Sequence, residues 1–370
     1  MQTKHVKVIL SVFLIAMVAL ALGFSSQPAS AVTPPSSSAQ AGSVAGITNA
    51  DDGVVVAAAK PWTAAQMKAA IPYPLEQVDS SSAGLSSDVT AGPNGPAGFV
   101  PGARPGAGTA AAAAAESFAG DVTLGVSPLG YGYPSPFTRF HVGAISAYTT
   151  YPFTTIGKLF FNQSGLSYVC SASVQGLRGI VTAGHCVHKG NGLASGWSTN
   201  VVFVPAYRNG VAPYGQWSIP TLRTFTDWYL HGTAGDFDHD WGAGYTRQLI
   251  NGKTIGQTVG YLGYAYNFSR VQSWWLLGYP QAAPFNGALM WACTSSYAYD
   301  SPFYSGGPAP MVAGCDQTGG TSGGPWIMKF GSANYLNSVN SHRATARPQE
   351  LAGPYANLDT KTVIFDWARQ

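Results

Sequence analysis

The chain has 370 residues, more than a single small domain usually needs. Only 9% of them are charged and the net charge is +3, so the sequence lacks the basic runs typical of nucleic-acid binding, and no nucleic-acid partner is expected. Many glycines and prolines, together with 12% aromatic residues, favour a β-rich exported protein over a helical cytosolic one.

The N-terminus has the pattern of a secretory signal peptide. Lys4 and Lys7 precede an apolar run over residues 8–24, and Pro-Ala-Ser-Ala at 28–31 offers the small residues of a cleavage site. The alternative is a membrane anchor, because the run is close to the shortest that spans a bilayer, about 17 residues. The cleavage site favours removal of residues 1–31. We find no second spanning run and expect a secreted, extracellular protein without a stable membrane span.

Residues 32–135 differ in composition from the rest of the chain. They are rich in Ala, Gly, Ser and Pro, with an alanine tract at 110–115, and they contain few charged or aromatic residues. Such a segment buries too little apolar surface to offset the entropy lost on ordering. We therefore predict a largely disordered pro-region or linker, with one short helix within residues 60–70 that has Pro61 near its first turn.

From about Tyr131 onward, short apolar and aromatic runs alternate with Gly, Asn and Pro turns. Many short strands at close spacing indicate an all-β sandwich or barrel, and a stretch of this length suits two small barrels. A short terminal helix is expected at 362–368. The expected strands are 157–162, 168–174, 179–183, 201–206, 217–220, 241–245, 258–264, 274–278, 289–293, 325–330 and 335–340.

All four cysteines follow residue 169, and an even number in an exported chain indicates two disulfides. Four cysteines allow three pairings, and the sequence alone does not choose among them. The local choice pairs Cys170 with Cys186 and Cys293 with Cys315.

Residues 320–325 read Gly-Thr-Ser-Gly-Gly-Pro, a pattern that predicts a nucleophile loop around Ser322. The glycines allow a tight turn in which the backbone N–H groups of Gly320 and Ser322 face one point, as an oxyanion hole requires. The alternative is a glycine-rich turn with an incidental serine.

Because a serine hydroxyl needs a base to become nucleophilic, a histidine should lie nearby in the fold. Residues 182–186 read Thr-Ala-Gly-His-Cys and offer His185, which Cys186 would hold in place. His188 raises the alternative of a His-x-x-His metal pair. That pair lacks a third ligand nearby, so no metal and no cofactor are expected.

The acid that orients the histidine is expected within Asp236–Asp240. Three carboxylates on one face of a strand would repel, so at least one of them should lie in a loop. The D-x-D-x-D pattern resembles a calcium loop but has Trp241 where such loops need glycine. We choose Asp240, which directly precedes an apolar strand, and place Asp238 second.

Taken together, these motifs resemble the trypsin-like (chymotrypsin-fold) serine endopeptidases, and most of all the bacterial branch that contains the glutamyl endopeptidases. The matching pieces are residues 182–186, 240–243 and 320–325, in the family's order His, Asp, Ser. The resemblance covers about the last three-fifths of the chain. It implies an all-β fold of two six-stranded antiparallel Greek-key barrels with the active site between them, the first barrel at 136–250 and the second at 251–370.

The resemblance also implies a substrate-binding strand at 336–342, where Ser341 would lie behind the acid and the backbone from Ser341 to Arg343 would pair with an extended peptide. His342 belongs to the same strand. Asn340 stands where glutamyl endopeptidases carry a histidine that binds the Glu side chain, so a preference for Glu is not expected.

Two further positions, Thr321 and Arg343, depart from the family pattern, and Asp316 bears on substrate selection. Thr321 stands where the animal digestive enzymes have an aspartate that pairs with a newly cut N-terminus, so that form of activation is not available. Asp316 lies six residues before Ser322, where trypsins hold the aspartate that selects Arg or Lys. Arg343, which stands where those pockets usually have glycine, would fill or neutralise such a pocket, and Asp316 as a plain turn residue is the competing interpretation.

The sequence therefore predicts a monomeric, secreted serine endopeptidase that acts on polypeptides through His185, Asp240 and Ser322. The alternative is a non-catalytic protein of the same fold that binds peptides or cell-wall material through its aromatic residues. A structural wall or adhesion protein would need repeats, and the sequence has none.

Overall fold

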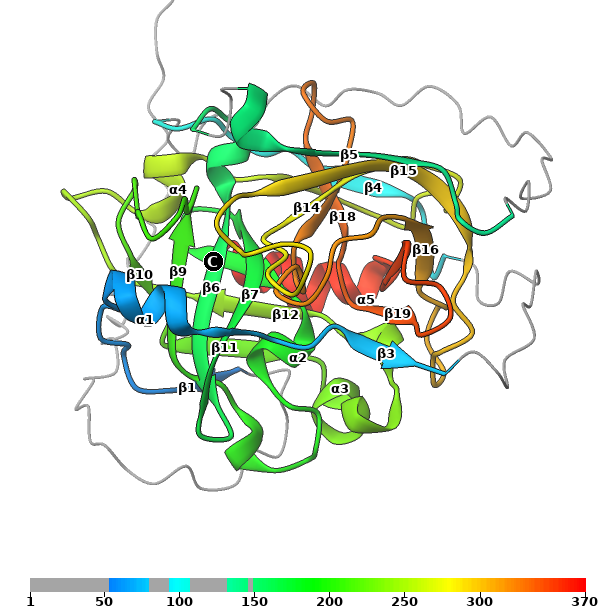
Figure 1. Ribbon diagram of the computed structural model, residues 1–370, viewed down its shortest axis with the longest axis horizontal. Coiled ribbons are helices and arrows are strands. Elements are labelled where there is room, and N and C mark those ends of the chain that lie inside the picture. The colour runs from blue at the N-terminus through cyan, green and yellow to red at the C-terminus, as the bar shows by residue number, and fades with distance from the viewer. Residues whose placement is uncertain (1–52, 80–92, 107–131, 146–148) are drawn as a thin grey trace, which may run out of the picture. The chain divides into compact units, whose positions relative to one another are not determined.

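The computed structural model describes residues 53–79, 93–106, 132–145 and 149–370, and the expected signal peptide lies outside these ranges. The described residues form two curled sheets, mostly antiparallel, which confirms the expected all-β fold with two barrel-like halves (Figure 1).

The first sheet contains the strands on which the histidine motif depends. Its strands run in the spatial order β11, β12, β8, β7, β6, β9, β10. The β6–β7 hairpin turns through Ser164 and Gly165, which both have positive φ (51° and 82°), as a two-residue hairpin turn requires. The strands are β6 (Ile156–Gln163), β7 (Leu166–Gln175), β8 (Gly179–Thr182), β9 (Thr199–Pro205), β10 (Trp217–Ser218), β11 (Thr221–Thr224) and β12 (Gly242–Tyr245).

The second sheet carries the serine motif in the loop before β17. Its strands run in the spatial order β19, β20, β16, β15, β14, β17, β18, β13, and β13 pairs parallel with β18. The strands are β13 (Gly263–Tyr266), β14 (Ser273–Gly278), β15 (Trp291–Asp300), β16 (Met311–Gly314), β17 (Pro325–Met328), β18 (Tyr335–Val339), β19 (His342–Ala344) and β20 (Glu350–Gly353).

The segment expected to be largely disordered is ordered over residues 53–79 and 93–106, so that part of the prediction is wrong. Its strands add two to each sheet, and the sheets have nine and eleven strands in all where six each were expected. Composition suggested too little apolar surface, but these residues pair with barrel strands far away in the sequence, and Trp62 and Tyr73 are buried there. The elements are β1 (Val54–Val55), α1 (Ala64–Ala69), β2 (Ile71–Pro72), β3 (Glu76–Val78) and β4 (Gly98–Val100).

Helix α1 lies within the range predicted for it, but Pro61 precedes the helix instead of opening it. The helix begins with a capping box in which Thr63 accepts from the backbone of Gln66 and the Gln66 side chain accepts from the backbone of Thr63.

A second capping box corrects the strand expected at 258–264. Thr254 and Gln257 cap α4 (Ile255–Val259), and the strand β13 begins only at Gly263. The other helical turns are η3 (Val142–Ile145), η4 (Phe153–Thr155), α2 (Gly184–Val187), η5 (Ala194–Gly196), α3 (Thr226–His231), η6 (Gly232–Ala234) and η7 (Phe237–His239).

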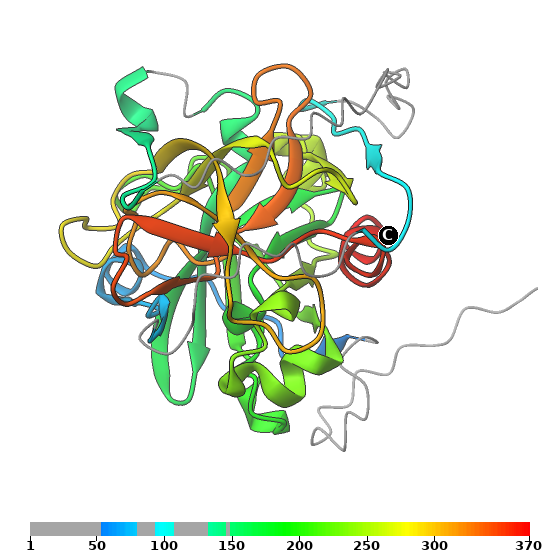
Figure 2. The same ribbon diagram turned by 90° about the vertical axis from the view of Figure 1, so that its right-hand side faces the viewer.

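Two elements cross the expected barrel boundaries. Strand β5 (Phe137–His141) pairs with β15 of the second sheet, although it precedes the first sheet in the chain. The terminal helix returns to the first sheet, where Phe365 packs edge-on against Trp241. It consists of α5 (Leu358–Thr360), η8 (Lys361–Phe365) and α6 (Asp366–Ala368). Figure 2 shows this helix nearly end-on at the C-terminus.

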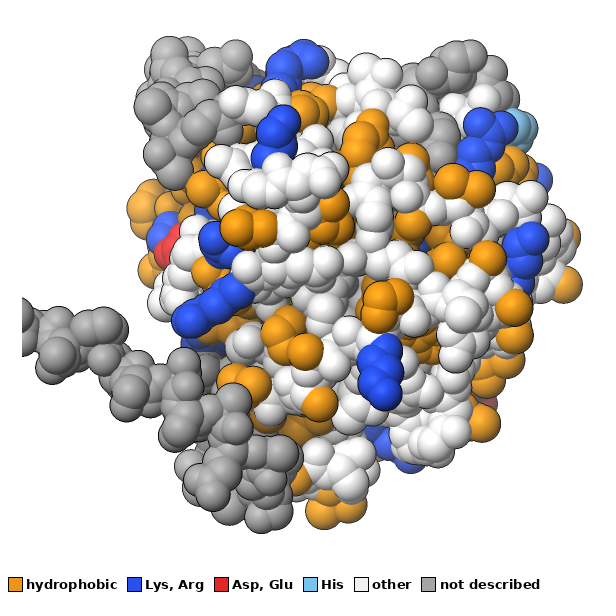
Figure 3. Space-filling model, turned by 90° about the vertical axis from the view of Figure 1, so that its left-hand side faces the viewer, with side chains coloured by type: hydrophobic (Ala, Val, Ile, Leu, Met, Phe, Trp, Pro, Cys, Tyr) orange, Lys and Arg blue, Asp and Glu red, His pale blue; other side chains and the backbone are white. Residues whose placement is uncertain are grey.

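The surface carries few charges, as the composition requires. On the face shown in Figure 3, the described Lys and Arg side chains lie apart from one another among uncharged side chains. Among the described residues, no helix is both long and apolar enough to cross a membrane.

Candidate active site

His185 lies on the single helical turn α2 that follows β8, and its surroundings hold the turn tightly. A Cβ on Gly184 would lie 2.8 Å from the Trp228 ring and 3.0 Å from Asp240 Oδ1, so only glycine fits there. Cys186 forms a disulfide with Cys170 of β7, which confirms one of the two expected bridges. The histidine is therefore placed by a strand end, a close backbone approach and a crosslink.

Asp240 holds His185 at two points. Its Oδ1 accepts from the backbone N–H of His185 and its Oδ2 accepts from Nδ1, both at 2.9 Å. Ser341 Oγ donates to Oδ2 as well, at 2.6 Å, so Ser341 lies behind the acid as expected. Hydrogen bonding by Nδ1 to the carboxylate leaves Nε2 of the neutral imidazole as the atom that accepts a proton.

The electrostatics of the pair match this arrangement. Burial lowers the pKa of His185, but the charge and hydrogen bond of Asp240 outweigh it, so the pKa is raised above its usual value. Burial raises the pKa of Asp240, but His185 and Ser341 outweigh this effect and hold it below its usual range. The pair thus favours an ionised Asp240 and a histidine that accepts a proton readily.

The loop before β17 places Ser322 between the two sheets. Gly320 and Gly323 both have positive φ (94° and 77°), and a Cβ on Gly323 would lie 1.9 Å from Thr182 Oγ1. Ser171 of β7 holds the loop at two points: its N–H donates to Ser322 O at 2.7 Å and its Oγ donates to Gly320 O at 2.9 Å. The first sheet therefore supports the serine loop directly.

Ser322 Oγ and His185 Nε2 are both buried, and among the described residues neither has a hydrogen-bond partner. Contacts of this kind are often long before a substrate binds and tighten in the reacting complex. Ser322 itself is 0% exposed and His185 is 1% exposed, so the site is covered.

Asn340 is not placed to bind a substrate, which corrects that expectation. It is fully buried, and its Nδ2 donates to Thr321 Oγ1 at 2.9 Å while its Oδ1 accepts from Trp326 Nε1 at 2.7 Å. Both ends of the amide are thus occupied, and the side chain braces the serine loop from behind.

The strand expected at 336–342 is broken, because β18 ends at Val339 and β19 begins at His342. His342 is buried at the start of β19, and its imidazole is neutral. Its ring stacks on Phe237 with centroids 4.1 Å apart, and its nitrogens hydrogen bond to Ser301 Oγ (2.9 Å) and Ser341 Oγ (3.1 Å). Burial lowers its pKa to about 3. The side chain is used by the fold, so only the backbone of His342 remains to pair with a peptide, and in this structure Glu76 of β3 lies beside it.

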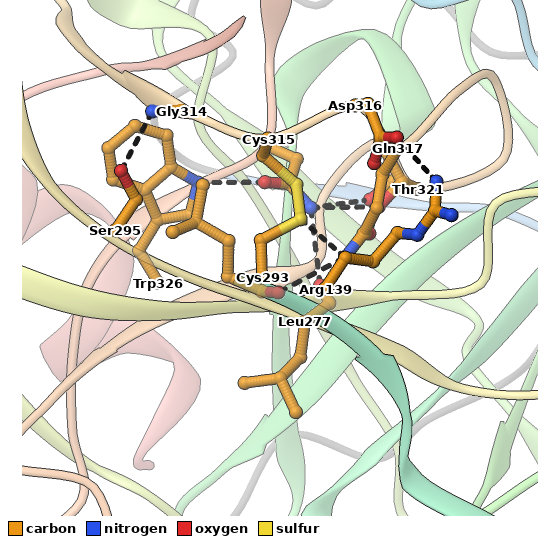
Figure 4. Close-up of a disulfide and its surroundings, with 12 residues drawn as sticks. Arg139, Leu277, Cys293, Ser295, Gly314, Cys315, Asp316, Gln317, Thr321 and Trp326 are labelled. Atoms are coloured by element: carbon orange, nitrogen blue, oxygen red, sulfur yellow. Dashed lines mark hydrogen bonds and ion pairs between the residues drawn. A yellow bond between two sulfur atoms is a disulfide. The ribbon is translucent and has the colours of Figure 1, made fainter. Parts of the chain in front are cut away.

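Asp316 follows the second disulfide, Cys293–Cys315, which is also confirmed (Figure 4). Its carboxylate forms an ion pair with Arg139 of β5, drawn as a dashed line in Figure 4. Buried Arg343 donates to the backbone carbonyls of Gln317 and of Pro348, the latter at 2.6 Å. Two cations therefore lie near Asp316, which weakens it as a receptor for a basic side chain.

The other two aspartates of the acidic run face away from His185. Residues 237–239 form the 3-10 turn η7, so the run is not a strand. Asp236 accepts from His239 Nδ1 (3.0 Å) and from Ser305 Oγ, while Asp238 accepts from the Ser305 backbone (3.1 Å). Burial, together with its neighbour Asp236, raises the pKa of Asp238 to about 6. Asp240, the expected acid, is the one beside His185.

His188, the partner in the metal alternative, is used by the fold. Its Nδ1 accepts from Gly190 N at 3.0 Å, and its Nε2 hydrogen bonds to Leu193 O at 2.9 Å. Burial lowers its pKa to about 4, so it is a neutral structural histidine.

Sequence reasoning missed one residue at the site, Tyr73, which comes from the upstream segment. Its ring stacks on His185 with centroids 5.2 Å apart and planes 27° apart. Its hydroxyl donates to Gln163 Oε1 at 2.9 Å. The sequence feature that could have pointed to Tyr73 is the Pro-Tyr-Pro sequence in an otherwise Ala- and Gly-rich stretch.

Comparisons with known proteins agree with this geometry. Protease Anisep from Arthrobacter nicotinovorans is 34% identical, with a TM-score of 0.53, covering 59% of this chain and 96% of that structure. The thermostable serine protease AL20 from an extremophilic microorganism is also 34% identical, with a TM-score of 0.53, covering 58% and 97%.

Two curated relatives match shorter stretches. A glutamyl endopeptidase of Bacillus licheniformis is 32% identical over 124 residues, 33% of this chain and 34% of its own. A protein of Bacillus subtilis named extracellular metalloprotease is 29% identical over 122 residues, 32% and 36%. The chain thus spans about a third of the length of the curated relatives it matches. No family model matches the chain.

Proposed function

Since the chain belongs to the chymotrypsin-fold serine proteases, we propose that it is a secreted serine endopeptidase that hydrolyses peptide bonds through an acyl-enzyme. The observation that carries the proposal is the double hydrogen bond of Asp240 to His185, with Ser322 in a glycine-built loop beside it. The name of the extracellular Bacillus subtilis relative supports secretion.

In the proposed reaction, His185 Nε2 takes the proton of Ser322 Oγ as the hydroxyl attacks the peptide carbonyl carbon. Asp240 keeps the other imidazole nitrogen protonated and stabilises the imidazolium that forms. The N–H groups of Gly320 and Ser322 bind the oxyanion. His185 then gives its proton to the leaving nitrogen, and water releases the acyl group by the same steps in reverse. The reaction needs no metal or other cofactor.

This chemistry fixes the direction of a bound substrate. The leaving nitrogen takes its proton from His185, so the half of the peptide that follows the scissile bond must lie on the side of His185 and β7. The half that precedes the bond must then extend along β19, running antiparallel to it, with backbone pairing to the region of Ser341 to Arg343. We take the substrate to be an extended polypeptide and the enzyme to be a monomer.

The test is covalent labelling of the processed, secreted protein with a fluorophosphonate, combined with a peptide-hydrolysis assay. We expect labelling of the wild type and none of Ser322→Ala, whose turnover should fall by about 10⁶. Ser332→Ala, which removes an exposed hydroxyl outside the site, is the matched control and should label normally. Activity should persist in strong chelators. A folded processed protein that neither labels nor hydrolyses any peptide would establish the non-catalytic alternative.

A further inference from the structure

Residues 70–78, here called the strap, cross the candidate active site from one sheet to the other. Strand β2 pairs with β7 (Ile71 beside Tyr168), and β3 pairs with β19 (Glu76 beside His342). Figure 1 shows this part of the chain running from α1 across the front of β6 and β7 to β3. The residues between the two strands therefore span the gap in which Ser322 and His185 lie.

At the centre of the strap, Tyr73 contacts two groups of the proposed machinery. Gly320 N, one of the two proposed oxyanion-hole donors, donates to Tyr73 O at 3.1 Å. The Tyr73 ring covers the imidazole of His185, and the side chain is only 8% exposed. The strap thus occupies a donor meant for the oxyanion and covers the base at the same time.

The next inward-facing side chain, Leu75, is buried on the other side of the cleft. It belongs to the apolar cluster of the second sheet that includes Cys293 and Cys315. Of its two neighbours, Pro74 is exposed and Glu76 is partly exposed. Tyr73 and Leu75, two residues apart, therefore both point into the molecule, Tyr73 into the apolar cluster that includes the first sheet and Leu75 into that of the second sheet.

The chain before the strap anchors it to the first sheet. Trp62 is buried against Phe160 with ring centroids 5.5 Å apart, and Gln216 hydrogen bonds to both the N–H and the carbonyl of Trp62, each at 2.8 Å. At the start of the strap, Gln281 Nε2 donates to Ala70 O at 2.6 Å. These contacts lie outside the reacting groups, so they hold the strap without using the catalytic machinery.

The strap runs in the direction opposite to a substrate. Its first half lies along β7 and its second half lies along β19, where it pairs parallel to the strand. If Ser322 attacked the Tyr73 carbonyl, the leaving nitrogen of Pro74 would lie toward β19, away from the proton on His185. The bond that sits in the oxyanion hole is therefore protected by its polarity.

Proline on both sides of Tyr73 reinforces this protection. Pro72 and Pro74 fix their own φ angles and restrict the residues before them to extended conformations, so the strap loses little entropy on binding.

We propose that the strap is a built-in inhibitor of this active site, bound in reverse polarity so that it blocks Ser322 without being cut by it. This inference rests on the proposed function. It implies that cleavage of the chain after the strap does not by itself open the cleft, because the strap and its anchor around Trp62 remain bound through their own contacts. It also implies that the same residues inhibit the processed enzyme as a separate peptide.

The first experiment labels the full precursor with a fluorophosphonate and separates precursor from processed protein on a gel. We expect the wild-type precursor to label slowly, and the processed form to label rapidly once the cleaved strap segment has been removed from it. Tyr73→Ala should raise the labelling rate of the precursor by about tenfold or more, because the ring over His185 and its hydroxyl contact to Gln163 are lost. Gln77→Ala, which changes an exposed strap residue, is the control and should label like the wild type.

The second experiment adds a synthetic peptide of residues 60–79 to the processed enzyme. We expect competitive inhibition, about tenfold weaker for the Tyr73→Ala peptide, with the peptide intact by mass spectrometry after prolonged incubation. This measurement is independent of how the precursor variants fold.

The outcomes separate the two proposals. Two outcomes overturn the strap proposal and leave the proposed function standing. In the first, the processed enzyme labels and hydrolyses substrates, but the wild-type precursor labels equally fast. In the second, the peptide is cut between Tyr73 and Pro74. Failure of every form to label overturns the proposed function. In that case, binding of a fluorescently labelled form of the 60–79 peptide to the processed Ser322→Ala protein still shows whether the strap occupies the cleft.

Discussion

Replacing Asp240 with asparagine tests the assignment of the acid most directly, because the structure determines how the amide must sit. The carboxylate accepts at three points, from the N–H of His185, from Nδ1 of His185 and from Ser341 Oγ. An asparagine has one oxygen and one NH₂ group. If its oxygen keeps the bond to the backbone N–H, its NH₂ group faces Nδ1. The imidazole must then carry its proton on Nε2, the atom that should accept the proton of Ser322.

The magnitude follows from this tautomer. The opposite orientation of the amide would set its NH₂ group against the buried backbone N–H, leaving a donor unsatisfied at a cost of about 1–3 kcal/mol. The inactive tautomer is therefore favoured, and turnover of Asp240→Asn should fall by roughly 10⁴. The backbone contact survives in this orientation, so the fold should persist.

The assay is the kcat of the processed enzyme on a peptide substrate, with circular dichroism to verify the fold. Asp238→Asn is the matched control, since Asp238 is bonded to the 305–307 loop and not to His185. Turnover of Asp240→Asn within tenfold of the wild type would refute the reasoning. So would a large loss in Asp238→Asn with Asp240→Asn unaffected.

Three further predictions concern stability and processing. Burial lowers the pKa of His342 to about 3, so below about pH 6.5 the unfolded chain binds a proton that the folded chain does not. The free energy of unfolding should therefore fall as the pH decreases from about 6.5 to about 3. A urea midpoint that stays constant over this range would contradict the prediction. Replacing Cys170 and Cys186 together by serine should cost about 2–5 kcal/mol in a denaturant melt and also lower kcat, because the bridge holds the turn of His185; unchanged stability counts against this. The mature N-terminus should fall before Phe137, because β5 pairs with β15 through five residues. Edman sequencing that starts inside or after β5 would show that the strand is dispensable.

The parts of the site that the sequence predicted are those set by local turn chemistry. Thr-Ala-Gly-His-Cys and Gly-Thr-Ser-Gly-Gly-Pro each need glycine at a position where a Cβ would collide, near Trp228 for Gly184 and near Thr182 for Gly323. The order of the motifs along the chain then gave the family and the two-sheet fold. The choice of Asp240 rested on its place before an apolar strand, and the structure places its carboxylate on His185.

The parts that the sequence missed depend on pairing across long separations. Residues 54–78 look too poor in apolar side chains to fold, yet Trp62 and Tyr73 enter a core that other segments supply. Asn340 looked like a pocket residue because of its position in the family pattern, but its amide hydrogen bonds to Thr321 and Trp326. Neither fact is visible without knowing which strands lie side by side.

The structure of the nucleophile loop explains why the proposed inhibition acts by covering the active site. Thr321, directly before Ser322, is fully buried, accepts from Asn340 Nδ2 and donates to Gln317 Oε1. None of these three side chains carries a charge, so the loop takes its shape without an ion pair to a newly cut N-terminus. A loop that is already formed in the uncut chain cannot keep the precursor inactive through its own disorder. The remaining means of control is to cover a formed site, and a segment bound across it in reverse polarity does so without becoming a substrate.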